Sequence, residues 1–179
     1  MKILHVFDHT LPLHSGYTFR SAAILRNQRK MGWETYHLSG PKQIDCTVME
    51  EDADGLHFYR TPKPAGLLAH LPGGDPFAVM GAIEKRLLAL AKELQPDVIH
   101  AHSPVLDAVP AIRVGRKLGI PVVYEIRAFW EDAAVDHGST KEGSLRYRLT
   151  RALETWAVKH ADAVTVICEG LRSDLAARG

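Results

Sequence analysis

Two histidines in the stretch VIHAH are the residues whose spacing best suits chemistry. His100 and His102 are two positions apart, so on a β-strand both side chains point to the same face of the sheet. His100 lies inside the expected strand 98–102, where a hydrogen-bonded core histidine is the more common role. His102 lies at the carboxyl end of that strand, where open α/β sheets bind their ligands, and we predict that it is the functional histidine.

Charged residues gather around the end of the next expected strand, 121–126. They are Glu125, Arg127, Glu131 and Asp132. A pair of carboxylates could serve acid–base chemistry, and the guanidinium of Arg127 suits an anionic group. The alternative is that Glu125 and Arg127 form a structural ion pair. Phe129 and Trp130 could stack on a sugar ring, although covering the core is the more common role of such side chains.

The loop after the first expected strand is a third candidate. Residues 8–15 are rich in turn-forming types, Ser15 suits a helix N-cap, and Gly16 begins the next helix. A glycine at this place lets a ligand approach the helix amides, which carry partial positive charge. The alternative is a glycine that only the turn requires.

Several common sites are absent from the sequence. The first turn lacks GxGxxG and the second strand ends without an acidic residue, which argues against a nicotinamide dinucleotide. No GxxxxGK[ST] motif supports an NTPase. His5, His9 and His14 are further metal candidates, but no carboxylate or cysteine set has metal-ligand spacing, so no metal is expected. Ser103 lacks a GxSxG context, so serine-hydrolase chemistry is weakly supported.

Apolar runs alternate with amphipathic segments along the chain. The expected strands are 3–7, 33–39, 56–59, 98–102, 121–126 and 163–167, and the expected helices are 21–31, 77–94, 105–118, 145–160 and 169–177. Loops are expected at 40–54, whose acidic cluster suits a solvated surface, and at 127–140. The helix 145–160 places Leu145, Leu149, Leu153 and Trp156 on one face. The alternation predicts one α/β domain, Rossmann-like, with a doubly wound parallel sheet.

The composition excludes several classes of protein. A chain of 179 residues with 46% hydrophobic residues can build a core, and a net charge of +1 gives no argument for a nucleic-acid partner. No apolar run is long enough to span a bilayer, and the N-terminus lacks a signal-peptide layout. Cys46 and Cys168 form no CxxC motif and suit a reducing cytoplasm. The leucines of the loop 61–76 (Leu67, Leu68, Leu71) suit a packed surface loop or an apolar lip for a greasy substrate.

Four stretches resemble the N-terminal domain of GT-B fold glycosyltransferases of the large retaining family 4, also called group 1. They are KILHVFDHTLPLHSGYTFRSAAILRNQRKMGWETY, LQPDVIHAHSP, GIPVVYEIRAFWED and ADAVTVICEGLRSDLAARG, and they cover nearly the whole chain in the family's order. DVIHAH and the last strand followed by EGLR are the more specific parts. The pattern is most similar to the branch linked to exosortase-type exopolysaccharide loci.

The resemblance implies two Rossmann-like domains that face a cleft, with the acceptor bound by the first and the nucleotide-sugar donor mainly by the second. His102 then reaches the transferred sugar and is the catalytic residue. The substrate-binding residues expected with it are Ser15, Gly16, Arg20, Glu125 and Arg127. Two places depart from the family pattern: Ser15–Gly16 stands where relatives have paired glycines, and Arg127 stands where a histidine is common.

The resemblance also implies the partners. We expect a nucleotide-sugar donor, a sugar or lipid-linked sugar acceptor, no cofactor, no metal and no nucleic acid, in the cytoplasm or at the inner face of the membrane. Residues 1–179 correspond to the acceptor-side domain and the donor domain is absent, so we expect this piece alone not to transfer sugar. The alternatives are a stand-alone α/β module that binds a small anion, and an NAD-dependent sugar-nucleotide epimerase or oxidoreductase.

Overall fold

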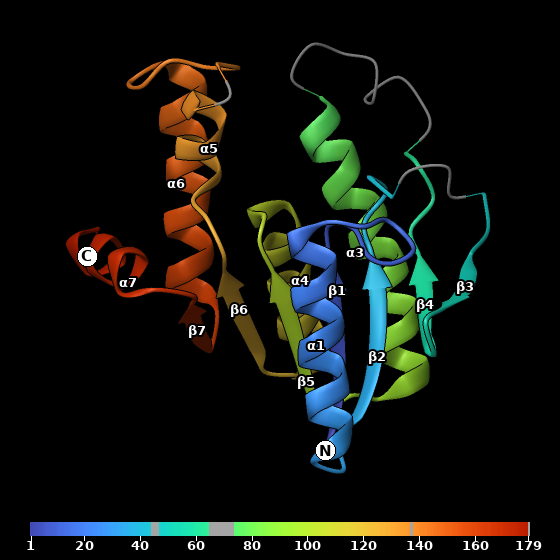
Figure 1. The fold of residues 1–179 in the computed structure, drawn as a ribbon. Coiled ribbons are helices and arrows are strands. Elements are labelled where there is room, and N and C mark those ends of the chain that lie inside the picture. Colours follow the sequence, from blue (N-terminus) through green and yellow to red (C-terminus); the bar gives the residue numbers. More distant parts are fainter. Residues whose placement is uncertain (44–46, 65–73, 137, 179) are drawn as a thin grey trace.

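A seven-stranded sheet organises the part of the chain that the computed structural model describes, residues 1–43, 47–64, 74–136 and 138–178 (Figure 1). The strand order is β3-β4-β2-β1-β5-β6-β7. The strands are β1 (Lys2–Phe7), β2 (Glu34–Ser39), β3 (Glu50–Ala53), β4 (Leu56–Arg60), β5 (Val98–His102), β6 (Val122–Ile126) and β7 (Ala163–Val166). The chain therefore starts in the middle, runs to one edge, returns to β5 beside β1 and runs to the other edge, which is doubly wound topology.

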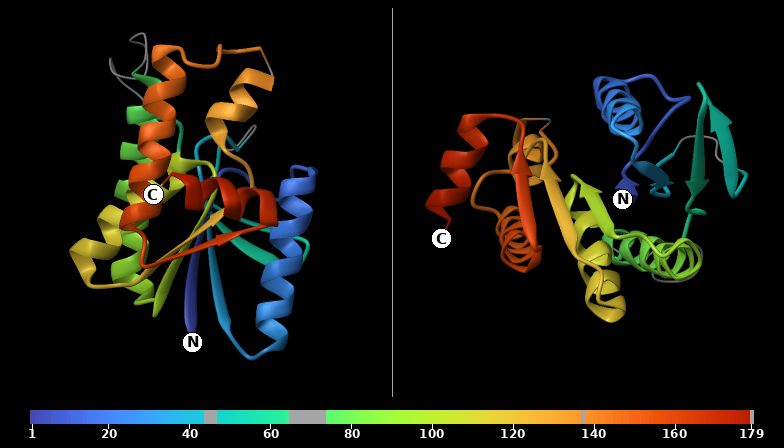
Figure 2. Two further views of the ribbon diagram at one scale, coloured as in Figure 1. Left: turned by 90° about the vertical axis from the view of Figure 1, so that its left-hand side faces the viewer. Right: turned by 90° about the horizontal axis from the view of Figure 1, so that it is seen from below.

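Helices cover both faces of this sheet. They are α1 (Gly16–Lys30), α3 (Asp75–Leu94), α4 (Val105–Leu118), α5 (Trp130–Asp136), α6 (Leu145–His160) and α7 (Glu169–Ala177). Seen along the strands, α1 and α7 lie on one face, and α3, α4 and α6 lie on the other (Figure 2). The expected α/β architecture is confirmed, and β1 and β5 end at the reversal point, where such sheets bind ligands.

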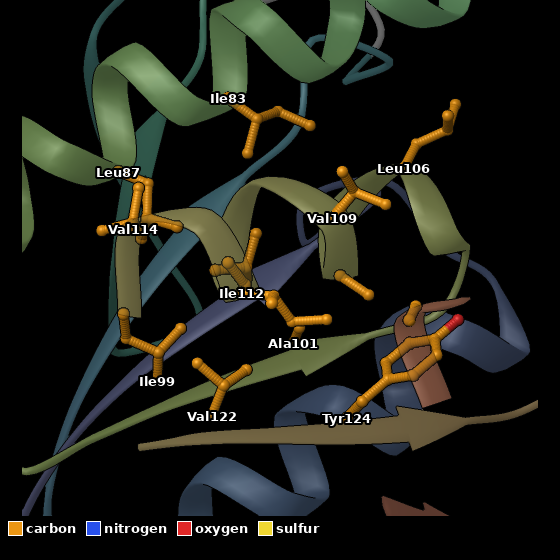
Figure 3. Packing of buried hydrophobic residues seen from close by; sticks show 14 of the residues in the cluster. Ile83, Leu87, Ile99, Ala101, Leu106, Val109, Ile112, Val114, Val122 and Tyr124 are labelled. Atoms are coloured by element: carbon orange, nitrogen blue, oxygen red, sulfur yellow. The ribbon is translucent and has the colours of Figure 1, made fainter. Parts of the chain in front are cut away.

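The face under α3 and α4 holds the main hydrophobic core. Leu87 of α3 and Ile112 of α4 belong to one buried cluster with Ile99 of β5 and Val122 of β6 (Figure 3). The helix α4 can lie this close to the sheet because it carries a glycine at its contact. A Cβ at Gly115 would stand 2.4 Å from a methyl carbon of Val122, closer than real side chains approach.

Both segments expected as loops, 40–54 and 127–140, contain regular structure. The first of them also corrects the prediction of a purely parallel sheet. The acidic segment forms β3, which pairs antiparallel with β4 at the edge of the sheet. Its residues alternate between exposed and half-buried, and Glu51 pairs with the fully buried Arg60 at 2.6 Å. The segment after β6 contains the short helix α5, which is anchored where Arg178 meets the buried Glu131 at 2.7 Å.

The expected apolar face of α6 is only partly covered. Leu145 and Leu149 are 73% and 62% exposed, whereas Leu153 and Trp156 are half-buried against the core. Of the residues singled out from the sequence, Cys46 and the leucines of the 61–76 loop lie outside the described residues. Within the described ranges, no helix is both long enough and apolar enough to cross a bilayer.

Candidate functional site

The sheet face under α1 is lined by histidines that are joined by hydrogen bonds. Arg127 Nη2 lies 2.9 Å from His102 Nδ1, His102 Nε2 lies 3.0 Å from His5 Nδ1, and His5 Nε2 lies 2.8 Å from Gln28 Oε1. A guanidinium can only donate, so His102 Nδ1 must accept. His102 Nε2 therefore donates to His5, and His5 Nε2 donates to Gln28. The series fixes the tautomer of both histidines.

These histidines are neutral. Burial, and the charge that a neighbouring histidine would carry, hold the pKa of His5 and of His102 well below the usual range. Burial also lowers the pKa of His100 to about 4, because the opposing effect of Glu125 is weaker. The prediction that His100 is a hydrogen-bonded core histidine is wrong on one point: its buried Nε2 has no hydrogen-bond partner among the described residues.

The Arg127 side chain connects α1 to the ends of β5 and β6 through hydrogen bonds. Its Nη1 donates to the carbonyl of Tyr17 at 3.1 Å and to Ser21 Oγ at 2.9 Å, both on α1. Its Nε donates to Glu125 Oε1 at 2.9 Å, and its Nη2 to His102. The side chain is 8% exposed and four of its five donors are used. The Glu125–Arg127 pair expected from the sequence is therefore present and is built into the fold.

Glu125 is the carboxylate that contacts the two cations of the site, Arg127 and Arg20. Burial alone raises its pKa, but the Arg127 guanidinium, whose Nε donates to Oε1 at 2.9 Å, opposes burial and favours the ionised carboxylate. Glu125 Oε1 is also 3.3 Å from Nε of Arg20, whose side chain is 47% exposed. Arg20 is thus the cation of this group that reaches solvent.

A second polar group lies in the loop between β1 and α1. Asp8 Oδ2 is 3.0 Å from His9 Nδ1, and His9 Nε2 is 3.0 Å from Ser15 Oγ. Ser15 caps α1, since its Oγ accepts the amide of Thr18 at 3.2 Å. Asp8 also pairs with Lys42 at 3.1 Å. The amides of Gly16 and the residue after it have no acceptor within the helix, so they remain available to a ligand.

Asp107 lies beneath this loop, in the first turn of α4. It is 1% exposed, and its Oδ2 has no hydrogen-bond partner in the described part of the chain. Burial and the nearby charge of Asp8 raise its pKa well above the usual range, which favours the neutral form of the acid. A Cβ at Gly40 would stand 3.1 Å from the Asp8 carbonyl and 3.6 Å from Asp107 Oδ1, so the backbone is close-packed here.

The structure brings most of the sequence-predicted site residues together. Arg20, Glu125, Arg127 and His102 form one connected group, and Ser15 and Gly16 lie at the start of the same α1 helix. The side chain of His102 is fully buried and both ring nitrogens are bonded within the protein, and its role as the catalytic residue stays a prediction. The sequence reasoning missed Asp107, and it considered His9 only as a metal ligand. Their position at the carboxyl edge of the sheet is the signal that could have found them.

Three of the histidines have the spacing of a metal site. One ring nitrogen each of His5, His100 and His102 lies within 4.8 Å of the others. The hydrogen bond between His5 Nδ1 and His102 Nε2 competes with metal binding, and the Arg127 guanidinium lies 2.9 Å from the other ring nitrogen of His102, Nδ1. Charge repulsion from the guanidinium disfavours a cation here. The absence of a metal stays a prediction.

Residues 15–179 match a family described as glycosyl transferase 4-like domain. A GDP-mannose-dependent alpha-mannosyltransferase of Mycolicibacterium smegmatis is 23% identical over 172 residues, which cover 96% of this chain and 44% of that protein. The chain therefore spans less than half the length of this curated relative.

Solved structures with the same fold include two enzymes of low sequence identity. Sucrose-phosphate synthase from Thermosynechococcus elongatus superposes with a TM-score of 0.71 at 12% identity, covering 99% of this chain and 45% of that one. UDP-GlcNAc 2-epimerase from Methanocaldococcus jannaschii superposes with a TM-score of 0.62 at 13% identity, covering 100% and 43%. At these identities the likeness establishes the fold alone.

Proposed function

Because the chain belongs to the glycosyl transferase 4-like domain family, we propose that it is the acceptor-side half of a nucleotide-sugar-dependent retaining glycosyltransferase with a GT-B fold. The family match over residues 15–179 is the observation that carries this proposal. The chain spans 44% of the related mannosyltransferase, which supports a second, donor-binding domain in the complete enzyme. We place the enzyme in exopolysaccharide or glycolipid synthesis, in the cytoplasm.

The α1 amino end supports a role in holding the donor diphosphate. The free amides of Gly16 and Tyr17 and the partly exposed guanidinium of Arg20 all lie on this end of the helix. A helix N-terminus and a guanidinium both favour an anion, and the diphosphate is the charged part of a nucleotide sugar. In this proposal Ser15 and Glu125 line the cleft, and the buried side chains of His102 and Arg127 hold the residues of the cleft in position.

A lipid-linked acceptor and a peripheral membrane contact belong to the same proposal. The exposed side of α6 carries Leu145 and Leu149 together with three arginines, Arg146, Arg148 and Arg151. None of the three has an ion-pair partner in the part of the chain that the structure describes. The amino end of α6 projects at the edge where the strands end (Figure 1). Leucines among unpaired arginines suit the surface of an anionic bilayer.

The test is sugar transfer by the protein made from the complete reading frame that contains this chain. With a panel of nucleotide sugars, we expect release of nucleoside diphosphate that depends on an acceptor, and no release by the 179-residue chain alone. Arg20→Gln should raise the KM for the nucleotide sugar at least about tenfold, the cost of one lost charge-assisted hydrogen bond.

Arg26→Gln is the matched control. Arg26 lies on the same helix and is 46% exposed, but it pairs with Asp54 away from the site. Its replacement should leave the KM unchanged. Transfer from none of the nucleotide sugars by the complete protein would contradict the proposed function, and equal effects of the two substitutions would contradict the role of Arg20.

A further inference from the structure

Asp8, His9 and Ser15 form a series of hydrogen bonds that leads to a hydroxyl group. A carboxylate only accepts, so the 3.0 Å contact with Asp8 Oδ2 places the proton of the neutral imidazole on His9 Nδ1. His9 Nε2 then carries a lone pair, and it faces Ser15 Oγ at 3.0 Å. The His9 ring is held in this orientation by stacking on Tyr17, with 4.7 Å between ring centroids. The serine hydroxyl therefore donates to a histidine that a carboxylate orients.

The carboxylate at the start of this series stays ionised. Burial alone raises the pKa of Asp8, but the hydrogen bond from His9 and the charge of Lys42 outweigh burial and bring the pKa below its usual value. Lys42 contacts the other carboxylate oxygen, Oδ1, at 3.1 Å, so it does not displace His9 from Oδ2. An ionised Asp8 can both hold the imidazole tautomer and stabilise the imidazolium that forms when His9 takes a proton.

Ser15 Oγ keeps one free lone pair. The hydroxyl has two acceptors within reach, His9 Nε2 at 3.0 Å and Thr18 Oγ1 at 3.4 Å, of which His9 is the nearer, and the oxygen accepts the Thr18 amide at 3.2 Å, which leaves one of its two lone pairs unused. Ser15 is partly exposed and Gly16 is exposed. Apart from its two chain neighbours and the backbone of its own helix, no heavy atom of the described residues lies within 4 Å of where a Gly16 Cβ would stand, so the space in front of this helix end is open. The free amides of Gly16 and Tyr17 point out of the helix end next to it.

We propose that Ser15 is a nucleophile, with His9 as its general base and Asp8 as the residue that positions His9, and that the loop between β1 and α1 transfers small acyl groups from esters. Ser15 Oγ attacks the ester carbonyl carbon while its proton passes to His9 Nε2. The carbonyl oxygen becomes an oxyanion, which the Gly16 and Tyr17 amides stabilise. The ester C–O bond then breaks and the alcohol leaves with the proton from His9. Water, activated by His9 in the same way, hydrolyses the acyl-serine and releases the carboxylic acid.

Capping a helix does not by itself require this arrangement. Ser144 caps α6 in the same way, accepting the amide of Tyr147 at 3.2 Å. Its hydroxyl contacts Thr140 Oγ1 at 2.9 Å and no histidine. Ser15 and Ser144 are thus both partly exposed helix caps, and of these two Ser15 is the one that faces a base held by a carboxylate.

The proposal is tested with a fluorophosphonate probe and the purified 179-residue chain. We expect one covalent adduct, located at Ser15 by peptide mass spectrometry, and hydrolysis of p-nitrophenyl acetate that the probe abolishes. Ser15→Asn should remove both signals while keeping a side-chain oxygen for the cap. His9→Gln should slow labelling at least about 100-fold, the usual contribution of a general base. Asp8→Asn should slow it as well, because the imidazole tautomer is no longer fixed.

Ser144→Ala is the matched control and should label at the rate of the unmodified chain. Circular dichroism identifies any variant that has lost its fold, and only folded variants enter the comparison. No adduct at saturating probe, equal adducts at Ser15 and Ser144, or labelling that is unchanged in His9→Gln would each overturn the proposal. The assay contains no nucleotide sugar, so its outcome is independent of the proposed sugar transfer.

Discussion

The two faces of the sheet are held to their helices by different forces. Under α3 and α4 the contacts are aliphatic, and side chains such as Leu87 and Ile112 are at most 1% exposed. Under α1 the buried groups next to the sheet include His5, His102 and the Arg127 guanidinium, joined by hydrogen bonds of 2.8–3.0 Å. The α1 face also has a smaller apolar cluster, in which Leu25 of α1 packs with Phe7 and Phe58 of the sheet. One side of the sheet is therefore covered by an aliphatic layer, and the other combines a smaller apolar cluster with a polar network.

The two faces should therefore tolerate different kinds of side-chain substitution. Burial of apolar surface has no preferred direction, so an aliphatic layer accepts a side chain of similar volume. A buried polar network depends on every donor and acceptor, because each unpaired group keeps its full desolvation cost. The face that leads to the proposed ligand site is the one that depends on geometry, and this is what a fixed functional site requires.

Arg127→Met should produce the largest loss of stability and so give the sharpest test of this contrast. The substitution nearly keeps the length of the side chain but removes the guanidinium that bonds both Glu125 and His102. Removing one member of a buried charged pair costs about 3–5 kcal/mol. Arg127→Lys should recover only a small part of this loss, because an ammonium cannot reproduce the planar fork of donors. Urea unfolding followed by circular dichroism gives the free energies.

The solvent-exposed Arg26 is the control for that measurement. Arg26→Met removes an ion pair from the surface of α1 and should change the free energy of unfolding by less than about 1 kcal/mol. If Arg127→Met proves as mild as Arg26→Met, the polar network does not hold α1 to the sheet, and the contrast between the two faces is lost.

Leu87→Ala on the other face should cost somewhat less, about 3 kcal/mol, from lost burial and the cavity that remains. Leu87→Met should cost less than about 1.5 kcal/mol, because the volume is nearly conserved. The comparison of interest is the recovery by the conservative variant: large for Leu87→Met and small for Arg127→Lys, measured in the same unfolding experiment. Equal recovery at both positions would show that the two faces do not differ in kind.

The sequence was a better guide to the apolar face than to the polar one. The strands β5 and β6 carry apolar residues toward α4, such as Ile99 and Val122, and α4 ends at Gly119, whose φ of +71° is a common helix stop. These are local signals, and they predicted the α/β fold. β3 was missed because EEDA has low strand propensity, and its pairing depends on Arg60 in another strand.

The sequence predicted several residues of the candidate site but not the contacts between them. His102, Glu125 and Arg127 were expected at neighbouring strand ends because parallel strands share a carboxyl edge. The burial of His102 depends on the partners of its two nitrogens, on α1-facing His5 and on Arg127, and no local pattern encodes those. The Asp8–His9–Ser15 series was missed for the same reason, since the loop path brings Ser15 back to His9.

The smallest expected effect is a difference in pH dependence, because Glu154 on one face and His100 on the other have pKa values that burial shifts in opposite directions. Burial raises the pKa of Glu154, which bonds Tyr124 on the α4 side, to about 7. On the α1 side the pKa of His100 is lowered to about 4. For Glu154 the folded state binds the proton more tightly than the unfolded state, so its contribution to stability is lost as pH rises from about 4.5 to 7. For His100 the neutral form is favoured by folding, so its contribution is lost as pH falls from about 6.5 to 4.

Unfolding of the unmodified chain, Glu154→Gln and His100→Asn at pH 4.5 and pH 7 separates the two groups. Raising the pH should destabilise the unmodified chain relative to Glu154→Gln and stabilise it relative to His100→Asn, each by about 2 kcal/mol, since one pKa unit corresponds to about 1.4 kcal/mol and local opening relieves part of each shift. The two differences must have opposite signs. If both variants follow the pH profile of the unmodified chain, neither Glu154 nor His100 has the buried environment that the structure shows. The two faces would then not differ in how pH affects the free energy of unfolding.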